Sequence, residues 1–213
     1  MLARAGRWAR PERVEQRSSP EATFLRSRPL TRAAVAFADE LHAGQEREAD
    51  RAPFILHPLE VAALLSAHRY DDQVTAAAVL HDSIEGSDAT GDQIADRFGP
   101  RVAELVGTLT EPAEASGPSA KEVLRDQIAQ ADPEAAAIYA ADKVSKLREL
   151  RIHLSRAPGF AEEPVAGQKL DHYWKSLAIL ERRLGDHPLV VQLRFELEAL
   201  RELPPADART RGT

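Results

Sequence analysis

A histidine and two acids follow an apolar run in the segment 74–86, and their spacing could support metal chemistry. The run 74–80 leads directly into His81 and Asp82, and Glu85 comes four residues after His81. Positions i, i+3 and i+4 share one face of a helix, so these side chains would converge at one helix end. Burying unpaired charge is costly, and a divalent metal ion is the simplest partner that would satisfy them.

Two further residues extend this candidate metal site along the chain. His57 precedes a proline, and Asp142 follows the almost purely apolar run 135–141. Each has a structural alternative, because His57 could simply cap a helix. Asp142 could instead pair with Lys143 or Arg148. Cysteine is absent, so any metal would be held by histidine and carboxylate, which suits manganese, iron, zinc or magnesium.

The elements that would position these groups all read as helices, because capping signals precede stretches of helical periodicity. Asp71 or Asp72 can cap the helix that carries His81. Asp132, followed by a proline, predicts the start of the helix that carries Asp142. Other helix starts are predicted at Thr31, Pro58, Thr90, Pro100, Ser119 and Pro188.

No segment reads better as a strand than as a helix, and the chain shows no repeat and no second domain. Aromatic residues make up only 5% of the chain, which favours helices over a β-sandwich. We therefore expect an all-α fold, a single bundle of about eight to ten helices. The predicted boundaries are a disordered basic leader at 1–29, the folded domain at 30–203 and a disordered tail at 204–213.

Charge and hydropathy limit the partners that the chain can have. The first 30 residues hold seven arginines and three glutamates, whereas the whole chain has a net charge of −6. The acidic remainder argues against nucleic acid as a partner and leaves room for a small anionic ligand. No apolar run approaches the roughly 20 residues of a membrane span, and the N-terminus lacks the apolar region of a secretory signal. We expect a cytoplasmic protein without a membrane partner, and the oligomeric state stays open.

Several other polar residues are interpreted as structural. His42 lies near the end of a predicted helix and is expected to make a structural hydrogen bond, with a place in a pocket as the alternative. Lys121 and Arg125 could reach a phosphate, but a solvated helix face explains them more simply. His153 and His172 match no motif and are interpreted as surface or packing residues.

The metal-type residues occur in the order His57, His81-Asp82 and Asp142, and this order resembles the HD superfamily of metal-dependent phosphohydrolases. The local sequences are similar to the hydrolase domain of RelA/SpoT-type alarmone enzymes, whose free-standing version is the small alarmone hydrolase. The segments that carry this resemblance are 36–47, 53–65, 75–106 and 140–150. The resemblance implies a single HD-domain helical bundle.

The resemblance also assigns roles to the residues that match its motifs. The metal ligands that it implies are His57, His81, Asp82 and Asp142. One Mn²⁺ is the usual ion, and another divalent metal would also fit. Asp82 is then a catalytic residue as well as a ligand, and Glu85 would orient or deprotonate the attacking water. The implied substrate-binding residues are Arg47, which would pack against guanine, Lys143 and Arg148.

The implied activity is hydrolysis of guanosine 3′,5′-bis(diphosphate), with metal-bound water attacking the 3′-pyrophosphate. Three positions depart from the family pattern: Gly86 replaces a second acid, Glu48 replaces a basic residue and Lys146 replaces an asparagine. These departures keep two alternatives open. The chain could hydrolyse another nucleotide phosphate, such as the 2′-phosphate of NADPH, or it could be a catalytically degenerate module that binds metal or nucleotide.

Overall fold

The computed structural model describes residues 24–112 and 118–202, and these residues fold as a helical bundle. Within those ranges the β-type pairing is limited to one isolated bridge between Glu46 and Pro53. The all-α prediction is therefore confirmed. No helix in the described ranges combines the length and apolar character that crossing a membrane requires.

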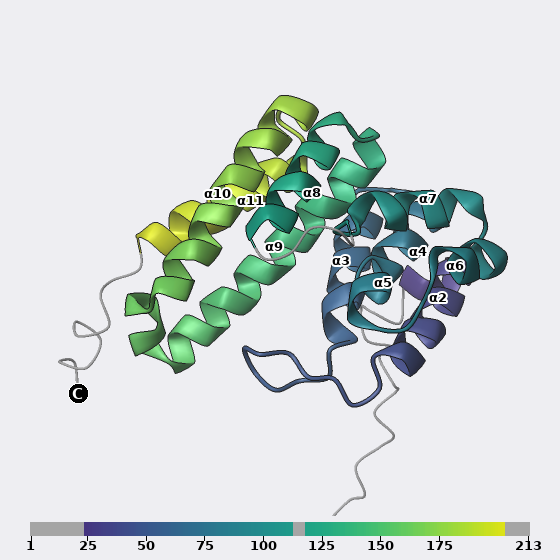
Figure 1. Cartoon of the computed structure of the whole chain (residues 1–213), viewed down its shortest axis with the longest axis horizontal. Helices are drawn as coiled ribbons and strands as arrows, with labels where there is room; N and C mark the ends of the chain where they lie inside the picture. The colour runs from purple at the N-terminus through teal and green to yellow at the C-terminus, as the bar shows by residue number, and fades with distance from the viewer. Residues whose placement is uncertain (1–23, 113–117, 203–213) are drawn as a thin grey trace, which may run out of the picture.

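The helices follow one another with short connections. In chain order they are η1 (Leu25–Ser27), α2 (Pro29–Leu41), α3 (Leu56–Ala67), α4 (Asp72–Leu80), α5 (Ser83–Gly86), α6 (Gly91–Phe98), α7 (Pro100–Leu109), α8 (Pro118–Gln130), α9 (Pro133–Arg156), η2 (Pro158–Glu162), α10 (Pro164–Leu184) and α11 (Pro188–Arg201). In Figure 1, α2 to α7 gather on one side and α8, α10 and α11 on the other. Helix α9 packs against elements of both groups and so joins the two halves.

Local capping signals set the starts of several helices as predicted. The Asp71 carboxylate accepts a hydrogen bond from the backbone N–H of Val74 at 2.9 Å and so caps α4. Thr90 and Gln93 form the predicted capping box at the start of α6. Asp132 caps α9, whose first residue is a proline. These caps satisfy N–H groups that would otherwise lack partners at the helix ends.

The start of α2 depends on a distant residue instead. Thr31 does not cap this helix, which begins two residues earlier at Pro29. The Asp72 carboxylate accepts hydrogen bonds from the backbone N–H groups of Leu30 and Thr31, each at 2.9 Å, and from the Thr31 hydroxyl at 2.6 Å. Asp72 therefore caps α2 from another helix, which local sequence patterns do not encode.

The described residues include only the last part of the predicted leader and none of the predicted tail. Residues 1–23 of the leader and the tail 204–213 lie outside the described ranges. Residues 25–27 form the turn of η1, and the side chain of Phe24 packs against the hydrophobic core. Residues 24–29, which were predicted to belong to the leader, are therefore part of the described fold.

Two buried helices dominate the core. Every residue of α4 from Val74 to Leu80 is buried, because this helix packs against α2, α3, α7 and α9. The segment 135–141 of α9 is equally buried. Polar groups that follow these apolar segments are carried into the interior of the protein, where water cannot easily satisfy them. The segment after α4 holds His81 and Asp82, and α9 holds Asp142.

Candidate metal centre and the adjoining cavity

Three helical segments bring the predicted metal ligands to one point. His57 lies in the first turn of α3, His81 follows α4, and Asp142 lies inside α9. The Nε2 atoms of His57 and His81 lie 3.2 and 3.5 Å from Oδ1 of Asp142. One ligand atom from each residue lies within 4.8 Å of the others, and all three side chains are buried.

A break in the helix brings Asp82 to the same point. The sequence predicted one helix through this segment, but α4 ends at Leu80 and Asp82 has φ −95° and ψ 0°. This sparsely populated backbone conformation turns the Asp82 carboxylate towards both histidines. Its Oδ2 atom lies 3.2 Å from Nε2 of His81 and 3.5 Å from Nε2 of His57.

The hydrogen bonding of these groups fits a divalent cation. Among the described residues, Nε2 of His57 and Nε2 of His81 are buried without a hydrogen-bond partner, and Oδ1 of Asp142 has only the Lys146 ammonium at 3.0 Å. Nδ1 of His81 lies 2.8 Å from the carbonyl oxygen of Ala78, so Nδ1 carries the proton and the Nε2 lone pair faces the centre. Imidazole and carboxylate donors of this kind could hold manganese, iron or zinc.

The charges around the centre favour a cation. Burial alone would raise the pKa of Asp142, but the ammonium groups of Lys143 and Lys146 hold it well below its usual value. Burial alone would lower the pKa of His57, but interactions with Asp142 and Asp82 raise it to about 10. Histidines must be neutral to bind a metal ion, so binding would displace this proton and metal affinity would increase with pH.

A hydrogen-bonded relay supports His57 from behind. Its Nδ1 atom lies 3.0 Å from the hydroxyl of Ser145, and that hydroxyl donates to Oε2 of Glu60 at 3.0 Å. Oε1 of Glu60 accepts a hydrogen bond from Arg148 at 2.8 Å. Arg148 also contacts Glu196, so its guanidinium belongs to an ion network with Glu60 and Glu196. Such outer contacts orient a ligating imidazole.

Glu85 lies on the short helix α5, one turn from the centre. Its carboxylate accepts a hydrogen bond from the backbone N–H of Glu111. Partial burial raises the pKa of Glu85 above its usual value, and this hydrogen bond opposes the shift. The side chain is therefore held in place by the start of the segment that follows α7.

Gly86 leaves space for a histidine rather than for an acid. A Cβ atom at position 86 would lie 3.2 Å from Cε1 of His42, which is closer than most such contacts. The His42 Nδ1 atom lies 2.9 Å from Oε1 of Gln45, and Nε2 of Gln45 donates to the carbonyl oxygen of Gly86 at 2.9 Å. The structural hydrogen bond expected for His42 is thus present, and it fastens the end of α5.

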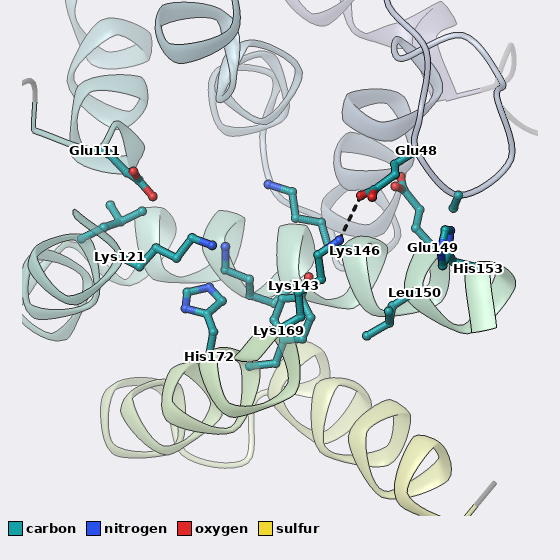
Figure 2. Close-up of a pocket in the computed structure, with 13 residues that line it drawn as sticks. Glu48, Glu111, Lys121, Lys143, Lys146, Glu149, Leu150, His153, Lys169 and His172 are labelled. Atoms are coloured by element: carbon teal, nitrogen blue, oxygen red, sulfur yellow. Dashed lines mark hydrogen bonds and ion pairs between the residues drawn. The ribbon is translucent and has the colours of Figure 1, made fainter. Parts of the chain in front are cut away.

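A cavity of about 310 Å³ adjoins the metal centre. Helices α8, α9 and α10 line it with four lysines, which are Lys121, Lys143, Lys146 and Lys169. Figure 2 shows Lys121, Lys143 and His172 gathered at one end of this cavity. Buried Arg125 lies behind His172, with NH1 2.7 Å from the Nδ1 atom of the imidazole. Three glutamates also line the cavity, and they are Glu48, Glu111 and Glu149. The positive charge is therefore concentrated at the end with Lys121, Lys143 and Arg125, and that end suits an anionic ligand such as a phosphate ester.

Of the four lysines, the sequence predicted only Lys143 as a substrate-binding residue. Lys121, His153 and His172 were interpreted as surface or packing residues, yet all three line the cavity. The residues come from different helices, so only tertiary packing brings them together. One signal was available: Lys143 and Lys146 are three residues apart, as are Lys169 and His172, and each pair therefore shares a helix face.

Only one of the three predicted substrate-binding residues lines the cavity. Lys143 lines the cavity, whereas Arg47 and Arg148 are not among its lining residues. Arg47 forms an ion pair with Asp50, and its NH1 atom lies 3.7 Å from Glu149. Its guanidinium is therefore engaged by acids of the chain.

Comparisons with known proteins agree with this geometry. The family profile described as "HD domain" matches residues 34–178. A guanosine-3′,5′-bis(diphosphate) 3′-pyrophosphohydrolase of Aquifex aeolicus is 44% identical over 78 residues, which cover 37% of this chain and 11% of that protein. A GTP pyrophosphokinase of Myxococcus xanthus is 29% identical over 180 residues, covering 80% of this chain and 22% of that protein. The chain thus spans about a tenth of the Aquifex protein's length.

Solved structures share the fold over most of the chain. One, described as a metazoan ortholog of SpoT that hydrolyzes ppGpp, has a TM-score of 0.72 and 26% identity, and the match covers 82% of this chain and 97% of that chain. The crystal structure of lmo0812 from Listeria monocytogenes has a TM-score of 0.63 and 24% identity over 70% of this chain and 97% of that one. The second likeness supports the fold alone.

Proposed function

This chain belongs to the HD domain family, and from that membership we propose that it is a metal-dependent hydrolase of guanosine 3′,5′-bis(diphosphate) that releases the 3′-pyrophosphate. The observation that carries the proposal is the convergence of two buried histidine Nε2 atoms, which have no hydrogen-bond partner among the described residues, on the buried Asp142 carboxylate beside a lysine-lined cavity. The names of the Aquifex relative and of the metazoan structure support the same substrate.

The proposed metal ligands are His57, His81, Asp82 and Asp142, and the proposed ion is Mn²⁺. A divalent ion held by these residues would supply Lewis acidity, which would polarise a phosphoryl oxygen and lower the pKa of a bound water molecule. The chain's own part is to fix the geometry. Ser145 sets the orientation of the His57 ring, and the Ala78 carbonyl sets the tautomer of His81.

Glu85 is the proposed group that orients the attacking water and takes its proton. It must be ionised to do so, and its pKa is raised by burial. Activity should therefore fall on acidification through a pKa above the ordinary glutamate value, rather than below it. Glu85→Gln should lower kcat by about 10²–10⁴ and remove this acidic limb from the pH profile. An unchanged limb in the variant would assign the proton transfer to another group.

Phosphate contacts are proposed for Lys143 and for the cluster at the end of the cavity. Burial and the nearby charges of Lys143 and Lys121 lower the pKa of His172 to about 3, so the imidazole is neutral at physiological pH. Arg125 donates to its Nδ1, which leaves Nε2 as a hydrogen-bond donor. These donors suit a substrate with a second phosphate group away from the one being cleaved.

A different nucleotide is the second candidate substrate. The observation in its favour is that Arg47, proposed to pack against guanine, pairs with Asp50. Glu48, which stands where a basic residue was expected, pairs with Lys169 at 2.9 Å. This side of the cavity therefore offers less free positive charge than the family pattern implies, and a nucleotide such as NADPH, cut at its 2′-phosphate, is the alternative to test.

The deciding experiment loads the purified protein with Mn²⁺ and follows guanosine 3′,5′-bis(diphosphate) by ion-exchange chromatography. We expect GDP and pyrophosphate as products, with no turnover by Asp82→Ala, since this variant lacks a proposed ligand. NADPH and other nucleotide phosphates are assayed in parallel. Faster turnover of one of them would move the proposal to that substrate, and retained activity in Asp82→Ala would contradict the metal site.

Gly86 bears on the remaining alternative, a catalytically degenerate module. Gly86→Asp restores the second acid, but its Cβ would press on His42, so the single variant confounds chemistry with packing. The pair Gly86→Asp with His42→Ala removes that contact. If the protein is degenerate, the double variant should gain hydrolysis that His42→Ala alone lacks. If Glu85 suffices, activity in the unaltered protein is already substantial and the acid adds little.

The proposal includes a cytoplasmic location, a small nucleotide phosphate as the ligand, and no nucleic-acid or membrane partner. Its support is the acidic net charge of −6 and the lysine-lined cavity, which is of a size for one small anion. Whether the protein forms an oligomer stays open.

A further inference from the structure

Lys146 lies between the metal centre and the cavity. It is four residues after Asp142 on α9, and its Nζ atom lies 3.0 Å from Oδ1 of that aspartate and 3.8 Å from Oδ1 of Asp82. The Asp142 oxygen is the one that also faces Nε2 of His57 and His81. The lysine side chain is 35% exposed and lines the cavity, and Figure 2 shows it among the other lining residues.

Two positive charges would compete at this oxygen. A metal ion held by Asp142 and the histidines would lie within a few ångströms of the Lys146 ammonium, and like charges repel at that separation. An anion in the cavity would contact the ammonium and offset the repulsion. Without an anion in the cavity, Lys146 therefore weakens metal binding. With an anion bound, its charge is offset, so the metal ion and the anion can bind together.

From this geometry we propose that Lys146 couples metal binding to phosphate binding. The inference rests on the proposed function and deepens it, because it makes one residue responsible for cooperation between the two ligands. Coupling free energies are reciprocal, so phosphate should tighten metal binding by the factor by which metal tightens phosphate binding. The protein would then hold its metal most firmly when substrate is present.

The other cavity lysines lack this combination of contacts. Lys143 contacts Oδ2 of Asp142 at 2.7 Å, the oxygen that faces away from the histidines, and it is stacked over the ring of Tyr139. Lys169 pairs with Glu48 at 2.9 Å and, within the part of the chain that the structure describes, forms no ion pair with a residue of the metal centre. Lys169 is thus the matched control, since its removal takes the same charge from the same cavity without touching the centre.

The test measures Mn²⁺ affinity from the free-ion signal in electron paramagnetic resonance, with and without inorganic sulfate as the anion. Lys146→Met keeps an unbranched side chain of similar length and removes the charge, and it should bind Mn²⁺ about tenfold more tightly without sulfate. Sulfate should tighten Mn²⁺ binding by the unaltered protein and have little effect on Lys146→Met. Lys146→Arg should behave like the unaltered protein, and Lys169→Met should keep its Mn²⁺ affinity within about twofold without sulfate.

Each outcome decides between the proposals. If Lys146→Met binds Mn²⁺ no more tightly than the unaltered protein, the coupling role is overturned while the metal centre stands. If the unaltered protein binds no Mn²⁺, the metal centre and the coupling role both fall. Lys146→Asn is a second neutral variant in case Lys146→Met does not fold, and far-ultraviolet circular dichroism checks each protein before titration.

Discussion

Two polar clusters on α9 use the same residue types in opposite ways. Around Asp142, three buried donor atoms of the centre converge. About two turns further along α9, Arg148 and Arg151 contact the carboxylate of buried Glu196 on α11, at 3.3 and 2.5 Å. In the first cluster the two histidine Nε2 atoms have no hydrogen-bond partner among the described residues, and Oδ1 of Asp142 has only the Lys146 ammonium at 3.0 Å, whereas the second cluster pairs its charges within the chain.

This difference indicates a functional role for the cluster around Asp142 and a structural role for the network around Glu196. Leaving a buried polar atom without a partner costs free energy, so a protein that keeps several at one point needs another partner for them. A paired network such as the one around Glu196 needs nothing further. Residue type alone cannot distinguish the cases, which is why Arg148 was predicted to bind substrate although its guanidinium lies with Glu60 and Glu196.

The largest expected effect comes from removing the shared oxygen of the metal centre. Asp142→Asn keeps the shape of the side chain, but it replaces a charged ligand and should weaken Mn²⁺ binding more than about 100-fold, beyond the loss typical of an outer contact. Hydrolysis should fall below detection, while circular dichroism reports unchanged helix content. Metal binding at the original affinity would show that the unpartnered atoms have another role.

A smaller effect is expected from the residue that joins the two clusters. Ser145→Ala removes the hydroxyl between His57 and Glu60, and should weaken Mn²⁺ binding by about 10–100-fold because the imidazole loses its orientation. Calorimetric titration measures the affinity. Ser155→Ala, on the exposed end of the same helix, is the control and should match the unaltered protein. If Ser145→Ala and Ser155→Ala bound Mn²⁺ with equal affinity, the Ser145 contact would contribute nothing to metal binding, and the direct ligands alone would set the affinity.

The smallest effect is expected in the paired network. Glu196→Ala removes the acceptor of two arginines, and should lower the free energy of unfolding by about 1–2 kcal/mol, since both arginines are partly exposed and can be rehydrated. Urea denaturation measures the change, with the exposed Glu198→Ala as the control on the same helix. Mn²⁺ affinity should not change. If Glu196→Ala lost metal binding but kept its stability, the Glu196 network would serve the metal centre and not the fold.

The sequence was most informative where information is local. Caps at Asp71, Thr90 and Asp132 are read from a few neighbouring residues, and the structure confirms them. The histidines and acids of the centre were found because their order follows a family motif, and the structure brings them together. The break after α4 was missed, since the conformation of Asp82 is set by packing and not by its neighbours.

Apart from Lys143, the charged residues that line the cavity could not be predicted from the sequence, for a related reason. The lysines of the cavity come from α8, α9 and α10, and a lysine that lines a cavity has the same local pattern as one on a solvated face. The capping of α2 by Asp72, some 40 residues away, belongs to the same class of contact. Contacts between distant elements need the assembled fold.

Glu60 has a consequence for how sequences of this kind can diverge. One of its oxygens accepts from Ser145 and the other from Arg148, which are three residues apart on α9 and so share a face. A substitution at any one of these positions leaves a partner unsatisfied at another, so the three should change together between relatives. In an alignment, positions 60, 145 and 148 are therefore expected to vary as a linked set, while the metal-type residues beside them stay fixed.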